Sequence, residues 1–277
     1  MKSFRLQILP TTQLNDYLRQ MRAGLQQAFD ALKNAEISTP DFSFHTCVAV
    51  MASSKIEGEP MEIDSYIKHR MLNVEYLEDL TQKPDDLYQA YLFAQKNKLT
   101  QKNFLKAHIL LSGHLLPKNK RGVCRRVNMV IMEQKTFRIQ YEAAPADEVK
   151  GLFDSLWRDI ESLKRKTLSI EEIFYFASFI HIVFVNIHPF EDGNGRAGRL
   201  LEKWFIAAIL GEKAWFMQSE LYYYRHVNSY YKNLNCLGMF YEQLDYGKAM
   251  PFLLMLPSSV RDDRPALGGR QALDVRR

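Results

Sequence analysis

The stretch EEIFYFASFIHIVFVNIHPFEDGNGRAGRLLEKWFIAAIL (171–210) predicts two helices joined by a glycine-rich turn. Its first part is mostly apolar, lacks glycine and proline, and is long enough for about four helical turns. Pro189 cannot simply continue this helix, and it pushes His188 toward an extended conformation. The Gly-Asn-Gly turn (193–195) permits positive φ angles. A second helix is therefore expected over 195–210, with apolar residues at helical spacing.

The predicted turn has the chemistry of an anion-binding site. A helix N-terminus presents free N–H groups and the positive end of the helix dipole. Arg196 and Arg199 are three residues apart, so both side chains can reach the same anion. His188 lies at the rim, and with a pKa expected near neutrality it suits a general base. This combination meets the needs of phosphoryl or nucleotidyl transfer.

The segment HPFEDGNGRAGR (188–199) resembles the Fic family motif HPFx[D/E]GNGRxxR at every fixed position. The resemblance implies transfer of AMP from ATP to a hydroxyl side chain of a target protein. It implies that His188 takes the proton of that hydroxyl and that Asp192 holds Mg²⁺ on the α- and β-phosphates.

The same resemblance implies where ATP binds. The implied phosphate-binding residues are Gly193, Asn194 and Gly195 in the turn, and Arg196 and Arg199 at the β/γ end. The pair Tyr230-Tyr231 resembles the segment that lines the adenine and metal side in Fic proteins, so Tyr231 is expected beside the nucleotide. Aromatic residues at this spacing are also typical of a core, and the match weakens after this pair.

A second motif lies upstream, in AVMASSKIEGEP (49–60). Ser53 and Glu57 are i,i+4 on one helix face, and Gly58 is a typical residue just past a helix end. Alone, this would be an ordinary solvated last turn. The string resembles the inhibitory motif [S/T]xxxE[G/N] of self-restrained Fic proteins. The resemblance implies that Glu57 pairs with Arg199 and leaves ATP without an in-line path to the target oxygen.

The segment NMVIMEQKTFRIQYE (128–142) alternates and is rich in β-branched and aromatic residues, which predicts a hairpin. In the Fic family, a hairpin here is the flap that docks the target by strand pairing. Its second strand would be 137–141, with Ile139, Gln140 and Tyr141 as docking residues. A plain connecting hairpin is the alternative. The basic run 118–126 is expected to be a solvated loop, or to help hold ATP or an acidic target.

The expected fold is mainly all-α, a Fic-type helical bundle with a small β-hairpin flap. The predicted regions are an N-terminal helical region with the inhibitory helix (1–99), a catalytic core (100–256) and a flexible tail (257–277). Further helices are expected over 12–33, 41–57 with Asp41 as N-cap, 84–97 opened by Pro84, 100–116, 145–164, 168–187 and 218–234. His108, His114 and His181 are interpreted as core or surface histidines rather than catalytic or metal-binding residues.

Composition adds modest limits. The chain has 277 residues and 47% hydrophobic residues, enough for a good core. The formal net charge of +5 suits an ATP-binding protein and makes no case for DNA binding. Cys47, Cys124 and Cys236 are far apart and are expected to be reduced thiols in a cytoplasmic protein. The N-terminus lacks a sustained apolar region, so no signal peptide is expected. The longest apolar stretch contains Ser178, His181 and Asn186 and is expected to fall short of a membrane span.

The sequence therefore predicts a protein adenylyltransferase that uses ATP and Mg²⁺ and is auto-inhibited by Glu57. One alternative is removal of AMP, with Glu57 aligning a water molecule. Another is a nucleotide-binding regulator with little turnover, against which the intact His188 argues. The target protein cannot be read from the sequence. The protein itself is one candidate, and a homodimer is compatible with the sequence.

Overall fold

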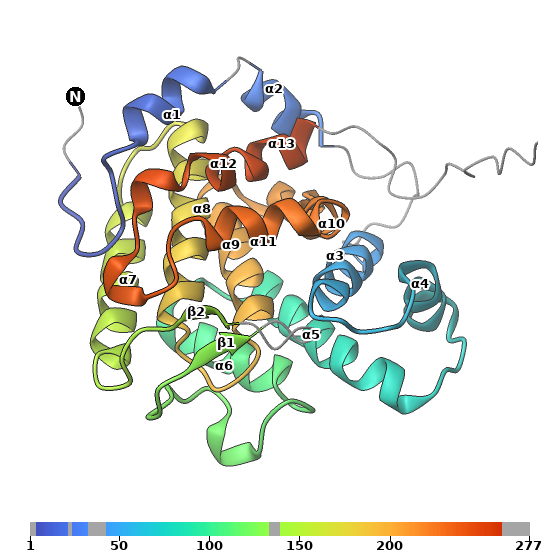
Figure 1. Ribbon diagram of the computed structural model, residues 1–277. Helices are drawn as coiled ribbons and strands as arrows, with labels where there is room; N and C mark the ends of the chain where they lie inside the picture. Colours follow the sequence, from blue (N-terminus) through green and yellow to red (C-terminus); the bar gives the residue numbers. More distant parts are fainter. Residues whose placement is uncertain (1–3, 22–23, 33–42, 133–138, 262–277) are drawn as a thin grey trace, which may run out of the picture.

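A computed structural model describes residues 4–21, 24–32, 43–132 and 139–261. It is mainly helical with one small antiparallel hairpin, which confirms the expected fold class (Figure 1). The α-helices are α1 Leu14–Gln20, α2 Leu25–Asp30, α3 Ser43–Ile56, α4 Ile63–Leu72, α5 Glu78–Lys96, α6 Gln101–Leu111, α7 Val149–Lys164, α8 Ile170–Ile187, α9 Asn194–Leu210, α10 Ser219–Arg225, α11 Val227–Asn235, α12 Met250–Leu253 and α13 Met255–Arg261. The strands are β1 Val130–Met132 and β2 Ile139–Glu142, and short 3-10 helices are η1 Lys118–Lys120, η2 Glu212–Phe216, η3 Tyr241–Gln243 and η4 Tyr246–Lys248.

Helix α8 is the central element of the core. Ser169 and Glu172 start it with a capping box, in which each side chain accepts a hydrogen bond from the other residue's backbone N–H. Its length and mean hydropathy of 1.6 would suffice to cross a membrane, so the expectation that this stretch falls short of a span was wrong. However, 94% of the helix is buried among other elements, as in the core helix of a globular domain.

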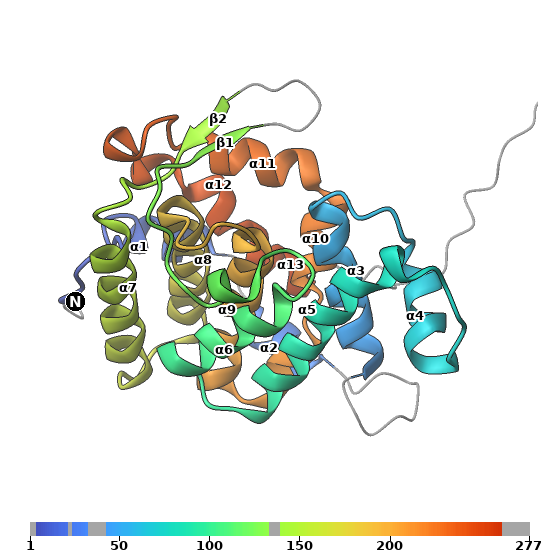
Figure 2. The same cartoon turned by 90° about the horizontal axis from the view of Figure 1, so that it is seen from below.

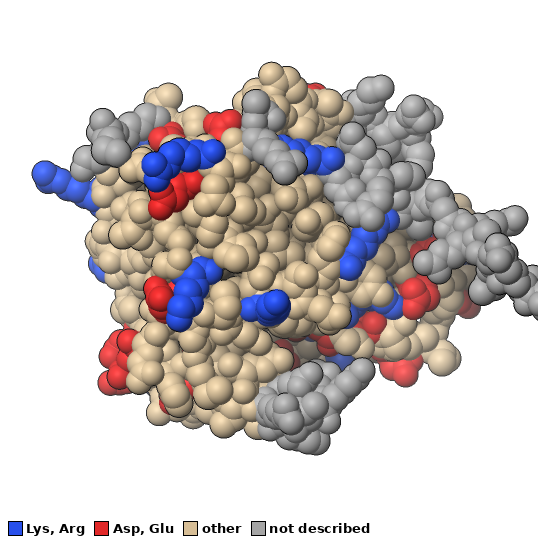
Figure 3. Space-filling view, turned by 45° about the horizontal axis from the view of Figure 1, so that its top comes forward, with Lys and Arg blue, Asp and Glu red and all other residues tan. Residues whose placement is uncertain are grey.

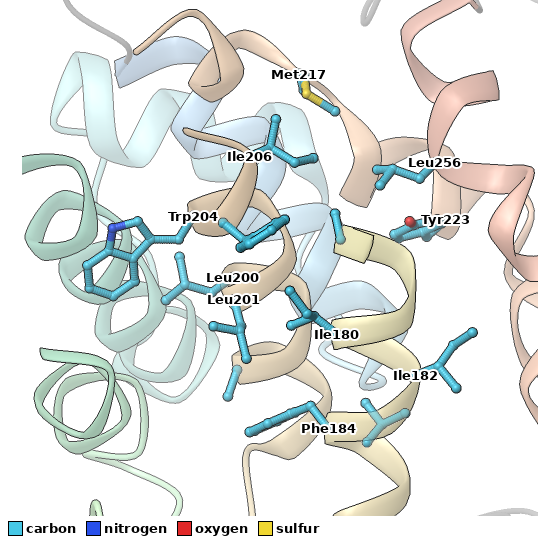
Figure 4. Close-up of a cluster of buried hydrophobic side chains, with 14 of the residues drawn as sticks. Ile180, Ile182, Phe184, Leu200, Leu201, Trp204, Ile206, Met217, Tyr223 and Leu256 are labelled. Carbon is cyan, nitrogen blue, oxygen red and sulfur yellow. The ribbon is translucent and has the colours of Figure 1, made fainter. Parts of the chain in front are cut away.

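Helices α8 and α9 pack side by side through apolar faces (Figure 4). Ile180 and Phe184 of α8 face the same cluster as Leu201 of α9, and all three are fully buried. Phe184 also meets the ring of Phe104 from α6 at 5.5 Å between centroids. This packing fixes the turn between α8 and α9, where the motif lies.

The other helices flank this pair on both sides. Helix α7 lies on one side, and α3, α4 and α5 lie on the other, as two perpendicular views show (Figures 1 and 2). Helix α3 is buried on nearly all of its faces and packs against α4, α5 and α10. On the face in Figure 3, lysine and arginine side chains are scattered among uncharged residues and form no continuous basic patch.

Several predicted helix limits need correction. The expected helix over 12–33 is two short helices, and Gly24, with φ 97°, starts the second. Helix α5 begins at Glu78, so Pro84 lies inside it, where the only intrahelical bond that proline removes is the one to Leu80. The expected helix over 218–234 breaks at His226, which separates α10 from α11.

Two further expectations concern chain segments at the edge of the described residues. Helix α13 extends to Arg261, so the first part of the predicted tail, 257–261, is helical. The rest of that tail, the Asp41 cap and residues 133–138 of the hairpin lie outside the described residues.

We expect Phe184→Ala to lower the free energy of unfolding by about 3–5 kcal/mol, because it leaves a cavity between α8, α9 and α6. Denaturant unfolding followed by circular dichroism measures this. Leu77→Ala is the matched control, since Leu77 is 72% exposed and its truncation should change stability by less than about 0.5 kcal/mol. Equal losses in the two variants would contradict this account of the core.

Candidate functional site

The turn between α8 and α9 starts at His188, which adopts a left-handed conformation with φ 53° and ψ 60°. The expected extended conformation was therefore wrong. The backbone N–H of His188 still donates to Phe184 at 2.9 Å, which closes the last turn of α8. Arg125 holds the backbone in this unusual conformation. It donates from Nε to the His188 carbonyl at 2.7 Å and from its backbone N–H to the Pro189 carbonyl at 2.8 Å.

The turn is closed internally by the Asn194 side chain. Its Oδ1 accepts from the N–H of Phe190 at 2.9 Å, and its Nδ2 donates to the Phe190 carbonyl at 2.8 Å. The Phe190 ring stacks on His108 with 3.6 Å between centroids. His108 Nδ1 accepts from the N–H of Gly122 at 2.9 Å, so Nε2 carries the proton and donates to the Asp192 carbonyl at 3.0 Å. His108 is therefore a core histidine that supports the turn.

Gly193 begins α9 in a left-handed conformation, with φ 78°. The preceding Asp192 is exposed, and its Oδ1 accepts from the N–H of Gly193 at 2.6 Å. The described residues hold no group of three or more histidine, cysteine or acidic side chains that could bind a metal. A single exposed carboxylate at a helix N-terminus fits a magnesium ion whose other ligands are phosphate oxygens and water.

Arg199 is almost fully buried, with 1% of its surface exposed. It donates hydrogen bonds to oxygen atoms from α3, from the turn after α3 and from α11. It donates from Nη2 to Glu57 Oε1 at 2.6 Å and from Nε to Ser53 Oγ at 2.8 Å. Its Nη1 donates to the hydroxyl of Tyr230 at 3.2 Å. The structure thus brings together the residues of the two sequence motifs, which are far apart in the chain. Gly58, which follows Glu57 in the turn after α3, has a left-handed conformation with φ 87°.

The Glu57 carboxylate lies over the N-terminus of α9. A Cβ atom on Gly195 would come within 2.3 Å of Glu57 Oε1, so only glycine allows this approach. Burial acts to raise the pKa of Glu57, but Arg199 and Arg196 outweigh it, and the pKa falls below its usual value. An ionised carboxylate therefore occupies the anion site that the sequence assigns to phosphate.

A second carboxylate from the same turn holds the other arginine of the motif. Arg196 donates to Glu59 Oε1 at 2.8 Å, and both side chains are buried. Lys83 of α5 donates to the same oxygen at 3.1 Å. Sequence analysis missed Glu59, although its position two residues after Glu57 was a usable signal.

A buried chain of hydrogen bonds continues from Arg199 into the core. The Tyr230 hydroxyl lies 3.0 Å from His181 Nε2, and His181 Nδ1 lies 2.8 Å from Glu202. Glu202 is fully buried and also accepts from the Tyr223 hydroxyl at 3.0 Å. His181 is thus a polar link in the core as well as a packing residue, which its spacing from His188 did not reveal.

The predicted base is neutral. Burial lowers the pKa of His188 to about 4, so the expectation of a pKa near neutrality was wrong. Its Nδ1 lies 3.2 Å from the Val185 carbonyl and 3.1 Å from the Tyr141 hydroxyl. At neutral pH the imidazole therefore has one unprotonated nitrogen, as a general base requires.

The hairpin lies beside this turn. Strands β1 and β2 pair antiparallel, with Ile131 opposite Tyr141. Ile139 is half exposed, and the hydroxyl of Tyr141 lies 3.1 Å from His188 Nδ1, a contact that the sequence did not predict. Tyr231 donates from its hydroxyl to the Ile56 carbonyl at 3.1 Å, which places it beside the turn that carries Glu57.

A family model described as the Fic/DOC family matches residues 98–206. A comparison with curated proteins finds no match. Among solved structures, a Fic family protein from Desulfovibrio desulfuricans G20 aligns with TM-score 0.73 and 19% identity, covering 94% of this chain and 75% of that one. A Fic domain containing signaling protein from Bacteroides thetaiotaomicron aligns with TM-score 0.62 and 16% identity, covering 86% and 93%.

Fic-1 (residues 134–508) from C. elegans also aligns, with TM-score 0.62 and 16% identity, covering 89% of this chain and 69% of that one. At such identities the alignments show a shared fold. The family match spans the turn with His188, Asp192 and both arginines, whose geometry is that of an anion-binding site. The chain therefore contains a domain of the Fic/DOC family at residues 98–206.

Proposed function

We propose that this protein transfers AMP from ATP to a hydroxyl side chain of a protein. Fic domain proteins are often transferases that act on nucleotides. The observation that carries the proposal is the convergence at the N-terminus of α9 of a neutral imidazole, an exposed carboxylate and two arginines. These are the groups that a nucleotidyl transfer needs for deprotonation, metal binding and stabilisation of phosphate charge.

In the proposed reaction, unprotonated His188 takes the proton of the target hydroxyl. The hydroxyl oxygen bonds to the α-phosphorus, and the bond from that phosphorus to the pyrophosphate oxygen breaks. The N–H groups at the start of α9 and the guanidinium groups of Arg196 and Arg199 hold the phosphates. Asp192 would hold Mg²⁺, which when bound neutralises part of the phosphate charge.

The resting arrangement supports auto-inhibition. The Glu57 carboxylate lies where a phosphate would meet the N-terminus of α9, and it uses the guanidinium of Arg199. Glu59 uses that of Arg196. Both arginines of the motif are thus paired within the protein. We propose that ATP binds productively only when the turn that carries Glu57 and Glu59 moves away.

Removal of AMP from a modified protein is the second candidate. The observation that favours it is that Glu57 is ionised and lies close enough to His188 to influence its pKa. A carboxylate in that position could align a water molecule for attack on the phosphodiester. Glu57→Gly should raise the rate of AMP transfer in the first candidate and lower the rate of AMP removal in the second, which separates the two.

The flap supports a protein as acceptor. Val130, Met132 and Ile139 are each about half exposed along the hairpin. An extended segment of a target protein could add to this hairpin by main-chain hydrogen bonds while these side chains meet apolar residues of the target. We propose that the hairpin presents the acceptor hydroxyl to His188. This chain itself is one candidate target, and a second copy of it is a candidate partner.

We expect Glu57→Gly to raise AMP incorporation at least roughly tenfold, because Arg199 becomes free for the γ-phosphate and the α-phosphate can turn in line. The measurement is the transfer of label from α-labelled ATP to the protein itself and to a cell lysate. Glu75→Gly is the control, since Glu75 is exposed in the loop between α4 and α5. A fall in turnover of an AMP-modified protein would instead support removal of AMP.

We expect Glu59→Gln, in the Glu57→Gly background, to lower the KM for ATP by roughly two- to tenfold, because Arg196 loses its competing carboxylate. In the parent chain, the same substitution should have little effect, since Glu57 still holds Arg199. Steady-state kinetics over a range of ATP concentrations tests this. A rise in the KM would mean that Glu59 orients Arg196 for ATP binding.

We expect His188→Ala, in the Glu57→Gly background, to reduce AMP transfer by about 10²- to 10⁴-fold, the usual loss for a general base. ATP affinity by calorimetry should stay within a few-fold, because the phosphate-binding groups are other residues. A variant that transfers AMP as fast as its parent would disprove the assigned base.

A further inference from the structure

The side chain of Tyr141 reaches from the flap to the imidazole of His188. Its hydroxyl donates to the Val185 carbonyl at 3.1 Å and lies 3.1 Å from His188 Nδ1. The two rings meet edge-on, with 6.1 Å between centroids. The strand that is expected to dock a target therefore also contacts the proposed base.

Two groups beside Nδ1, the Val185 carbonyl and the Tyr141 hydroxyl, determine which nitrogen of His188 carries the proton. The Val185 carbonyl can only accept, and it lies 3.2 Å from Nδ1. The hydroxyl proton of Tyr141 is directed to the same carbonyl, so its oxygen is left as a second acceptor for Nδ1–H. Burial raises the pKa of Tyr141, so the hydroxyl keeps its proton. This arrangement favours the Nδ1–H tautomer, with the lone pair on Nε2.

Arg125 also links the hairpin to the turn that carries His188. Its guanidinium is buried and donates to the carbonyls of Val127 and Ala144, which flank the hairpin, each at 2.6 Å. It also donates to the carbonyl of His188. One side chain therefore ties both ends of the hairpin to the turn that carries His188, which Tyr141 also contacts.

We propose that Tyr141 is a positioning residue that, together with the Val185 carbonyl, holds His188 in the Nδ1–H tautomer and so leaves Nε2 free to take the proton of the acceptor. This inference deepens the proposed function and rests on His188 being the base. When Nε2 gains a proton, the Nδ1–H group gains positive charge, and its hydrogen bonds to the two oxygens strengthen. The flap then both holds the acceptor and prepares the base.

The first test does not depend on activity. Long-range ¹H–¹⁵N spectra of ¹⁵N-histidine-labelled protein report the tautomer of each histidine. We expect Tyr141→Phe, which keeps the ring, to raise the Nε2–H share of His188 about fivefold, since one neutral hydrogen bond is lost. Tyr175→Phe is the matched control, because its hydroxyl donates to the Pro10 carbonyl far from the turn. An unchanged His188 tautomer in Tyr141→Phe would overturn the proposal.

The second test measures AMP transfer in the Glu57→Gly background. We expect Tyr141→Phe to lower kcat by roughly 10- to 100-fold, the loss of a hydrogen bond to a group that becomes charged, with the KM for ATP unchanged. A kcat equal to that of the parent, or a loss that lies wholly in the KM, would overturn the positioning role. If the parent transfers no AMP, the proposed function fails, and the tautomer measurement alone decides the role of Tyr141.

Discussion

A buried guanidinium that must always have an anionic partner is the constraint on which this structure depends. Arg199 is withdrawn from water at the N-terminus of α9, and a charge in such a place is costly unless it is paired and fully hydrogen-bonded. In the structure Glu57, Ser53 and Tyr230 meet this need. In the proposed reaction a phosphate would meet it. The same physical requirement would thus serve folding in one state and the proposed substrate binding in the other.

This requirement explains why helices outside the matched domain contribute to the site. Glu57 comes from the turn that follows α3, and Tyr230 comes from α11, beyond residue 206. Helix α3 is held by burial along most of its length, whereas Glu57 and Glu59 follow its last residue in a turn. The backbone N–H groups of Glu57 and Glu59 both donate to the Ser54 carbonyl, so the buried helix fixes the position of the two carboxylates.

The sequence was informative where one local signal decided the outcome. The apolar run before Pro189 and the glycine-rich turn predicted the two helices and an anion site between them, whereas the pairing of Glu57 with Arg199 was implied by the resemblance to the inhibitory motif. Tertiary contacts decided the rest. Arg125 makes the left-handed His188 tolerable, and burial lowers the pKa of His188, neither of which a local pattern contains. The contact between Tyr141 and His188 was also not predicted, because strand alternation cannot tell which neighbour a side chain meets.

The charge states of His188 and Glu57 fit the proposed chemistry. Burial lowers the pKa of His188 and keeps it neutral, whereas the arginines lower the pKa of Glu57 and keep it ionised. A neutral base beside an anion site avoids placing another cation next to Arg199. In the proposed auto-inhibition, the ionised Glu57 would compete with phosphate intramolecularly, and such competition is strong because the carboxylate is always near its partner. In the proposed activation, phosphate would replace Glu57 as the anion at Arg199, so the guanidinium would remain paired in both states.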